Sequence, residues 1–223
     1  MARMVMKFGG TSVASIERIQ HVARLVQAEV RAGNEIAVVV SAMAGETDRL
    51  IALVDEAKAG NPGVELDYRE YDAVVSTGEQ VSAGLLTLAL IAIGIDARSW
   101  SGWQVPIKTD NAHGTARILG IENQALIEAL NKKQVAVITG FQGVNESNRI
   151  ATLGRGGTDT SAVAIAIASA PASRAPANAV RPTGRESTRL AEPSESGSAR
   201  WSDARIPERT IIHIDSAVMT LMP

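Results

Sequence analysis

The composition of this 223-residue chain changes abruptly after Ala168. The first 168 residues contain only two of the eight prolines and alternate apolar runs with helical patterns. In 169–210, by contrast, there are 8 Ala, 7 Ser, 7 Arg and 5 Pro, and only three residues are Val, Leu or Ile. Such a segment buries too little apolar surface to offset the conformational entropy that it loses on ordering. We therefore divide the chain into a folded domain, 1–168, and a largely irregular tail, 169–223, in which 211–222 is predicted to form one short strand or helix.

Within the folded domain, short apolar runs alternate with segments of helical periodicity. The runs at 36–40 and 135–139 consist almost entirely of Val, Ile and Ala, which is typical of parallel strands buried on both faces. This alternation predicts an α/β fold, a three-layer sandwich with a mainly parallel central sheet. The expected strands are 5–8, 36–40, 97–100, 105–108 and 135–139, and the expected helices are 15–32, 48–58, 66–75, 79–93, 123–131 and 160–168.

Composition and charge exclude several classes of protein. The 22 basic and 24 acidic residues give a net charge of −2, which removes the simplest electrostatic case for binding nucleic acid or an anionic membrane. Without cysteine there is no disulfide or cysteine nucleophile, and the three histidines are scattered, so no metal site is expected. One of them, His113, lies in a polar loop and is either functional or merely structural. The apolar stretch 84–95 is too short to span a bilayer, and no signal peptide is apparent, so we expect a cytoplasmic protein.

Four loops that follow strands or open helices carry the candidate chemistry, and two of these suit phosphate and hydroxyl binding. In an open α/β sheet the ligand crevice lies beyond the carboxyl ends of the strands, so the loops are expected to converge. Gly9 and Gly10 let backbone N–H groups approach a phosphate, and Lys7 adds a positive charge. Ser41 and Thr47 offer hydroxyls after the second strand. Taken alone, each loop is explained at least as well by ordinary turn and N-cap chemistry.

The other two loops carry charged side chains. Glu79 stands in the first turn of an apolar helix, where a carboxylate either stabilises the helix dipole or binds an ammonium group of a substrate. Arg155 lies among glycines, and Asp159 follows shortly before a helix. Arginine holds a carboxylate through two hydrogen bonds, glycines permit close approach of a phosphate, and Asp159 is suited to orient a cation or a lysine. A merely flexible glycine loop is the less favoured interpretation of this segment.

With the four loops taken together, residues 1–168 resemble aspartokinases, the aspartate kinases of the amino-acid-kinase superfamily. The order and spacing of the motifs fit that family throughout. The stretches that carry the resemblance are Lys7-Phe8-Gly9-Gly10-Thr11-Ser12-Val13, Val40-Ser41-Ala42-Met43, Ser76-Thr77-Gly78-Glu79-Gln80, Gly140-Phe141-Gln142-Gly143, and TLGRGGTDTSAVA at 152–164.

This resemblance implies a role for each candidate residue. Lys7 and Asp159 would be catalytic. Glu79 would hold the ammonium of the substrate, and Arg155 would hold its α-carboxylate. ATP is expected at Lys7, Phe8, Gly9 and Gly10, and the substrate is expected at Ser41, Thr47, Glu79, Arg155, Gly156, Gly157 and Thr158.

The resemblance further implies that the chain transfers the γ-phosphate of ATP, carried with Mg²⁺, to the β-carboxylate of L-aspartate. The product would be 4-phospho-L-aspartate, a precursor of lysine, threonine and methionine. The β-carboxylate, with an unperturbed pKa of about 3.9, is ionised near pH 7 and needs no general base. The site has only to align two anions and offset their repulsion. A kinase of another carboxylate or of a carbamate is a lesser alternative.

The resemblance stops within a helix after Ala168. Aspartokinases continue with a segment that holds the nucleotide and then with paired regulatory ACT domains, and the tail resembles neither. We hypothesise that a frameshift in a GC-rich gene truncated the domain, which translation of the alternative frame would test. We accordingly expect an exposed sheet edge, poor soluble expression and no feedback by lysine or threonine. The alternative function is a catalytically inactive fragment that binds aspartate or a full-length partner, and a homo-oligomer is compatible with either function.

Overall fold

The central sheet places the ends of several parallel strands side by side. The computed structural model describes residues 2–58, 63–170, 210–214 and 217–220. The sheet has six strands in the order β10-β9-β1-β2-β6-β3. Four of them are parallel to their neighbours in this order: β1 (Arg3–Phe8), β2 (Glu35–Val40), β6 (Val135–Thr139) and β3 (Ala97–Trp100). The predicted mainly parallel sheet is confirmed, and the loops after β1, β2 and β6 leave it at one edge.

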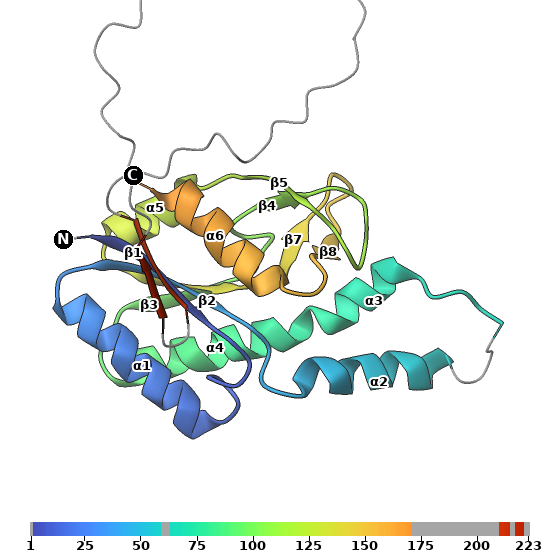
Figure 1. The fold of residues 1–223 in the computed structure, drawn as a ribbon, viewed down its shortest axis with the longest axis horizontal. Coiled ribbons are helices and arrows are strands. Elements are labelled where there is room, and N and C mark those ends of the chain that lie inside the picture. Colours follow the sequence, from blue (N-terminus) through green and yellow to red (C-terminus); the bar gives the residue numbers. More distant parts are fainter. Residues whose placement is uncertain (1, 59–62, 171–209, 215–216, 221–223) are drawn as a thin grey trace, which may run out of the picture.

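Helices cover both faces of this sheet (Figure 1). Because side chains alternate along a strand, Val38 and Val40 pack in one apolar cluster with α1 and α4, whereas Val39 packs in another with α5 and α6. Burial on both faces explains the continuous apolar run of β2 and confirms the predicted three-layer sandwich. The four helices are α1 (Ile16–Arg31), α4 (Thr77–Ala92), α5 (Gln124–Asn131) and α6 (Gly157–Ser169).

α1 shows how local sequence sets such an element. Its N-cap, Ser15, accepts a hydrogen bond from the backbone N–H of Arg18 at 3.4 Å. The buried residues Ile19, Val22 and Val26 recur at helical spacing and face the sheet. The helix predicted at 15–32 is therefore found with nearly the same bounds.

A smaller sheet adjoins the central one and has the order β5-β4-β7-β8. The sequence pattern predicted only β4, as a strand at 105–108. The other strands are three or four residues long, and such short runs carry no readable alternation. The bounds are β4 (Ile107–Thr109), β5 (Ile118–Ile121), β7 (Gln142–Val144) and β8 (Ile150–Thr152).

Two further helices, α2 (Glu46–Lys58) and α3 (Tyr68–Val75), project from the sandwich (Figure 1). α3 runs into α4, and together they form one helical stretch, Tyr68–Ala92. By length and composition this stretch could cross a membrane, although no apolar run in the sequence looked long enough. Half of its most apolar window is buried, and core helices of soluble proteins meet the same criterion, so the stretch is weak evidence of a membrane span.

The tail contributes two strands where the sequence pattern predicted one element. β9 (Thr210–Ile214) pairs in parallel with β1, and β10 (Ala217–Thr220) pairs antiparallel with β9. On this side of the sheet, β9 pairs with β1 and β10 is the outermost strand. That truncation exposes a sheet edge stays a prediction. The predicted irregularity of the remaining tail concerns 171–209, which lies outside the described residues.

Candidate active site

A pocket of about 410 Å³ opens where the loops after β1 and β2 meet the first turns of α4 and α6. These segments meet because β1, β2 and β6 are parallel and end at one edge of the sheet. The structure thus brings together the four loops that the sequence analysis singled out. The predicted site residues that line the pocket are Lys7, Gly10, Ser41, Thr47, Glu79, Arg155, Gly156, Gly157, Thr158 and Asp159.

Lys7 and Asp159 form an ion pair at the wall of the pocket. The Lys7 Nζ lies 3.1 Å from Oδ1 of Asp159. The Lys7 side chain, at the end of β1, is only 12% exposed, whereas that of Asp159, in the first turn of α6, is 53% exposed. Asp159 therefore holds the ammonium beside the positive end of the α6 dipole. An anion placed between Lys7 and the start of α6 would be attracted by both.

Hydroxyls and close backbone contacts join the loops across the pocket. The Ser41 hydroxyl donates to Oγ1 of Thr158 at 3.0 Å, which links the loop after β2 to α6. A Cβ at Gly10 would lie 2.9 Å from the carbonyl oxygen of Ala42, so only glycine allows the loops after β1 and β2 to approach this closely. The pocket walls are consequently fixed relative to one another.

Glu79 is a buried carboxylate with an unused oxygen. It is 3% exposed and lines the pocket from the first turn of α4. Oε1 accepts the backbone N–H of Ala42 at 3.0 Å, while Oε2 has no hydrogen-bond partner among the described residues. Burial raises the pKa of the Glu79 carboxyl from 4.5 to about 7, although the Ala42 N–H opposes the shift. A cationic group entering the pocket would satisfy Oε2 and favour the ionised form.

The loop that carries Arg155 owes its shape to glycine. Gly156 is the N-cap of α6 and has a left-handed backbone with φ of 77°, which other residues rarely adopt. Arg155 itself is exposed and lines the pocket. Its guanidinium is therefore accessible to a carboxylate ligand, and a guanidinium can hold a carboxylate through two parallel hydrogen bonds.

Two predicted ATP ligands, Phe8 and Gly9, are not among the residues that line the pocket. The Phe8 side chain is 3% exposed and packs in the apolar cluster with α1 and α4, because successive residues of β1 face opposite sides of the sheet. The Phe8 ring therefore does not line the pocket, and its backbone carbonyl accepts the Ser41 N–H at 3.1 Å. That Phe8 contributes to ATP binding stays a prediction. Gly9 lies in the turn next to the pocket, where its carbonyl accepts the Ser12 N–H at 2.9 Å.

Seven residues that line the pocket were not among the predicted site residues: Ala42, Met43, Ala44, Gly45, Asp48, Phe141 and Gly154. Phe141 follows β6 with φ of 66°. Phe141 belongs to a motif that supported the family resemblance, but the motif by itself assigned it no role. Asp48 carried no signal, because acidic residues are common in the first turn of any helix.

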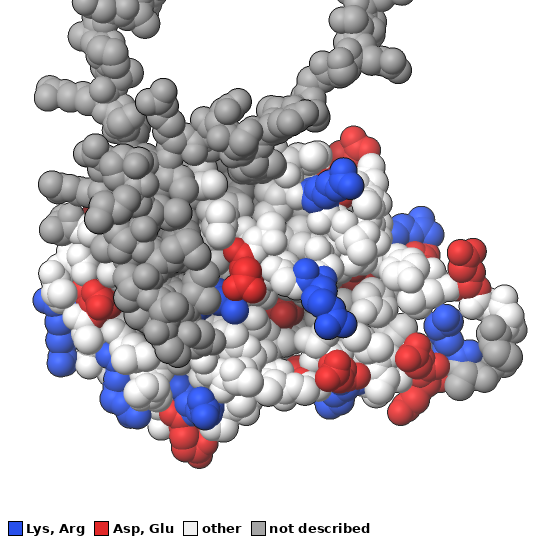
Figure 2. All heavy atoms as spheres, in the orientation of Figure 1, with Lys and Arg blue, Asp and Glu red and all other residues white. Residues whose placement is uncertain are grey.

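Outside the pocket, the described surface shows neither a cluster of metal ligands nor a patch of one charge on the face in view. In the described part of the chain, no three His, Asp or Glu side chains gather closely enough to hold a metal ion. Figure 2 shows acidic and basic side chains interspersed over the described surface of one face. The pocket, by contrast, gathers charged groups that can bind a ligand. Lys7, Arg155 and the N-terminus of α6 can bind anions, and Glu79 can bind a cation.

Sequence comparison finds relatives for this part of the chain. The profile of the amino acid kinase family matches residues 2–172. An aspartokinase from Rickettsia bellii (strain RML369-C) is 46% identical over 168 residues, which make up 75% of this chain and 41% of the relative. An aspartate kinase from Pseudomonas putida is 52% identical over 168 residues, which make up 75% of this chain and 40% of the relative. The chain therefore spans about two fifths of the length of these curated relatives.

Solved structures show the same fold. Aspartate kinase from Synechocystis superposes with a TM-score of 0.61 at 45% identity, covering 74% of this chain and 26% of that one. E. coli aspartokinase III, solved in complex with aspartate and ADP, superposes with a TM-score of 0.63 at 27% identity, covering 74% of this chain and 46% of that one.

Proposed function

Because this chain belongs to the amino acid kinase family, we propose that its pocket binds L-aspartate and the phosphates of ATP, as part of an aspartate kinase. The family places the chain among kinases, and the relatives that it matches are aspartokinases. The E. coli relative was solved with aspartate and ADP, which supports the same pair of ligands here.

One observation carries the proposal: opposite charges face a single small pocket. L-Aspartate has one ammonium and two carboxylates. The ammonium complements the unused Oε2 of Glu79, and the α-carboxylate complements the guanidinium of Arg155. Lys7 and the start of α6 then remain for phosphate.

The proposed reaction needs alignment more than proton transfer. An oxygen of the ionised β-carboxylate attacks the γ-phosphorus of ATP. The bond from that phosphorus to the β,γ-bridging oxygen breaks, and ADP leaves with its Mg²⁺. No proton has to move, since the nucleophile is already an anion near pH 7. Lys7 and the N–H groups at the start of α6 offset the charge of the transferring phosphoryl group, and Asp159 orients Lys7.

The remaining elements of the proposal follow from the same family. The product is 4-phospho-L-aspartate, on the route to lysine, threonine and methionine, and the setting is the cytoplasm. Mg²⁺ arrives with ATP as part of the substrate. A second candidate function is binding of aspartate, or of a full-length partner, without turnover.

Titration calorimetry combined with a turnover assay separates these functions. L-Aspartate and MgATP are titrated into the protein, and ADP release is followed together with hydroxylamine trapping of the acyl phosphate. Aspartate-dependent ADP release with hydroxamate formation supports the kinase. Saturable aspartate binding without either product supports the non-catalytic alternative. A folded protein that does not bind aspartate at millimolar concentration refutes both.

Lys7→Met tests the phosphate side of the pocket. Removing the ammonium should lower kcat by about a hundredfold, since one preorganised charge on the transferring group contributes on that scale. The matched control is Lys108→Met, which removes an ammonium that is 45% exposed and pairs with Glu122 instead of lining the pocket. Equal activity of the two variants would contradict the assignment of Lys7.

A further inference from the structure

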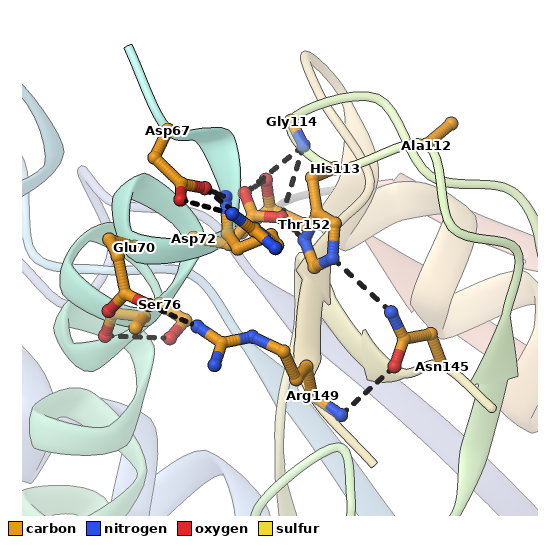
Figure 3. A network of polar contacts seen from close by, with 12 residues as sticks. Asp67, Glu70, Asp72, Ser76, Ala112, His113, Gly114, Asn145, Arg149 and Thr152 are labelled. Atoms are coloured by element: carbon orange, nitrogen blue, oxygen red, sulfur yellow. Dashed lines mark hydrogen bonds and ion pairs between the residues drawn. The ribbon is translucent and has the colours of Figure 1, made fainter. Parts of the chain in front are cut away.

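A second polar centre is formed by the side chains and backbone groups around Asp72 (Figure 3). Asp72 belongs to α3 and is fully buried. Its Oδ1 accepts the Thr152 hydroxyl at 2.5 Å, and its Oδ2 lies 2.7 Å from Nδ1 of His113. The backbone N–H of Gly114 lies 3.1 Å from both carboxylate oxygens. One carboxylate thus ties α3 to the end of β8 and to the loop that carries His113.

The rest of the network fixes the proton on His113. Oδ1 of Asn145 accepts the backbone N–H of Arg149 at 2.9 Å, so the amide nitrogen of Asn145 is the atom that faces His113. That nitrogen donates to Nε2 of His113 at 3.2 Å. Nδ1 therefore carries the proton that is donated to Asp72. His113, Thr152 and Gly114 thus all donate to Asp72, so both oxygens of this buried side chain have hydrogen-bond partners.

The groups that Asp72 holds are continuous with the loop that carries Arg155. Thr152 lies two residues before Gly154, and its carbonyl accepts the Ala116 N–H at 2.8 Å. A Cβ at Gly154 would lie 3.3 Å from the carbonyl oxygen of Gly114. The segment 113–116 therefore packs along 152–154 and supports the turn at Arg155.

The helix also connects Asp72 to Glu79. Both lie on the continuous helical stretch Tyr68–Ala92, seven residues apart, which is about 10 Å along a helix axis. The stretch is anchored between them, because the buried side chain of Gln142 donates to the carbonyl of Ser76 at 2.8 Å. A change at Asp72 would shift the Arg155 loop relative to this helix and so alter the span of the pocket.

We propose that Asp72 and His113 form a positioning pair that sets the distance between Glu79 and Arg155. Through that distance, the pocket recognises the ammonium and the α-carboxylate of one α-amino acid together. This inference rests on the proposed function of the pocket. Asp72 and His113 lie outside the pocket lining, and they act through Thr152 and Gly114.

The test compares ligands with and without the α-carboxylate. L-Aspartate, β-alanine, which lacks that group, and MgATP are each titrated into wild type, Asp72→Asn and Thr152→Val. Asp72→Asn should raise the Kd for aspartate about tenfold, because the spacing that lets Arg155 and Glu79 act together is lost. Thr152→Val removes one donor and should raise it about threefold. The preference for aspartate over β-alanine should shrink in both variants, with the Kd for MgATP unchanged.

A stability control separates positioning from general weakening. Leu126→Ala, on the buried face of α5, should lower the melting temperature without changing the preference for aspartate over β-alanine. If the variants at Asp72 and Thr152 lose affinity for all ligands in step with their melting temperature, the role is structural and the inference is overturned. Unchanged preference in Thr152→Val overturns it as well, even where Asp72→Asn does not fold. Failure of wild type to bind aspartate at all refutes the proposed function and, with it, the inference.

Discussion

Asp72 and Glu79 are two buried carboxyl groups on one helical stretch, and they differ in how many hydrogen bonds they accept. Asp72 receives hydrogen bonds from three groups, and both of its oxygens are used. Glu79 receives one, from the Ala42 N–H, and its other oxygen has no partner among the described residues. Burial raises the pKa of Glu79 to about 7. A buried carboxylate with all its donors in place holds segments together, whereas one with an unused oxygen at a pocket is prepared for a cation.

The two residues should differ most in the free energy of unfolding that is lost when each is replaced by alanine. Asp72→Ala leaves three donors without their acceptor and should lower the free energy of unfolding by about 3–5 kcal/mol. Glu79→Ala removes a carboxylate whose burial is poorly compensated, so its loss should be no more than about 1 kcal/mol. Urea unfolding of both variants measures the difference. Equal destabilisation of the two variants would show that the Asp72 hydrogen bonds add no more stability than those of Glu79.

For ligand binding, the larger effect should come from the change at Glu79 instead of the change at Asp72. Glu79→Gln keeps the shape of the side chain and removes the charge that pairs with the substrate ammonium. We expect the Kd for aspartate to rise by about a hundredfold, as for loss of one partner from a desolvated ion pair. Glu128→Gln, on the exposed side of α5, is the matched control and should bind as wild type does. Retained affinity in Glu79→Gln would remove Glu79 from the site.

The raised pKa of Glu79 predicts a smaller, graded effect of pH. Only the ionised carboxylate pairs with the ammonium, so below pH 7 binding must release a proton, and affinity for aspartate should fall about tenfold per pH unit between pH 7 and 5. Without ligand, the free energy of unfolding should fall as pH rises from 4.5 to 7, since the unfolded chain releases this proton first. Calorimetry in this range measures the first effect, and Glu79→Gln should abolish it. A flat profile in wild type would show that Glu79 is already ionised.

Much of the scaffold could be predicted because its signals are local. The apolar runs that became β2 and β6 and the periodicity that became α1 are each contained in a few consecutive residues. The strands β5, β7 and β8 were missed, since three or four residues hold no pattern and their pairing partners lie elsewhere in the chain. Most of the pocket could also be predicted, because its residues stand at the carboxyl ends of strands or at the starts of helices.

Local patterns in the sequence were enough to predict an α/β sandwich and the loops that carry its charged groups. Alternation along strands, helical periodicity and the glycines beside Lys7 and Arg155 are properties of neighbouring residues. Three features became visible only in the folded chain: the Phe8 ring packs in the core, Glu79 is desolvated, and Asp72 contacts partners 41 and 80 residues away. Burial and long-range hydrogen bonds depend on which segments pack together, and that information is spread over the whole fold.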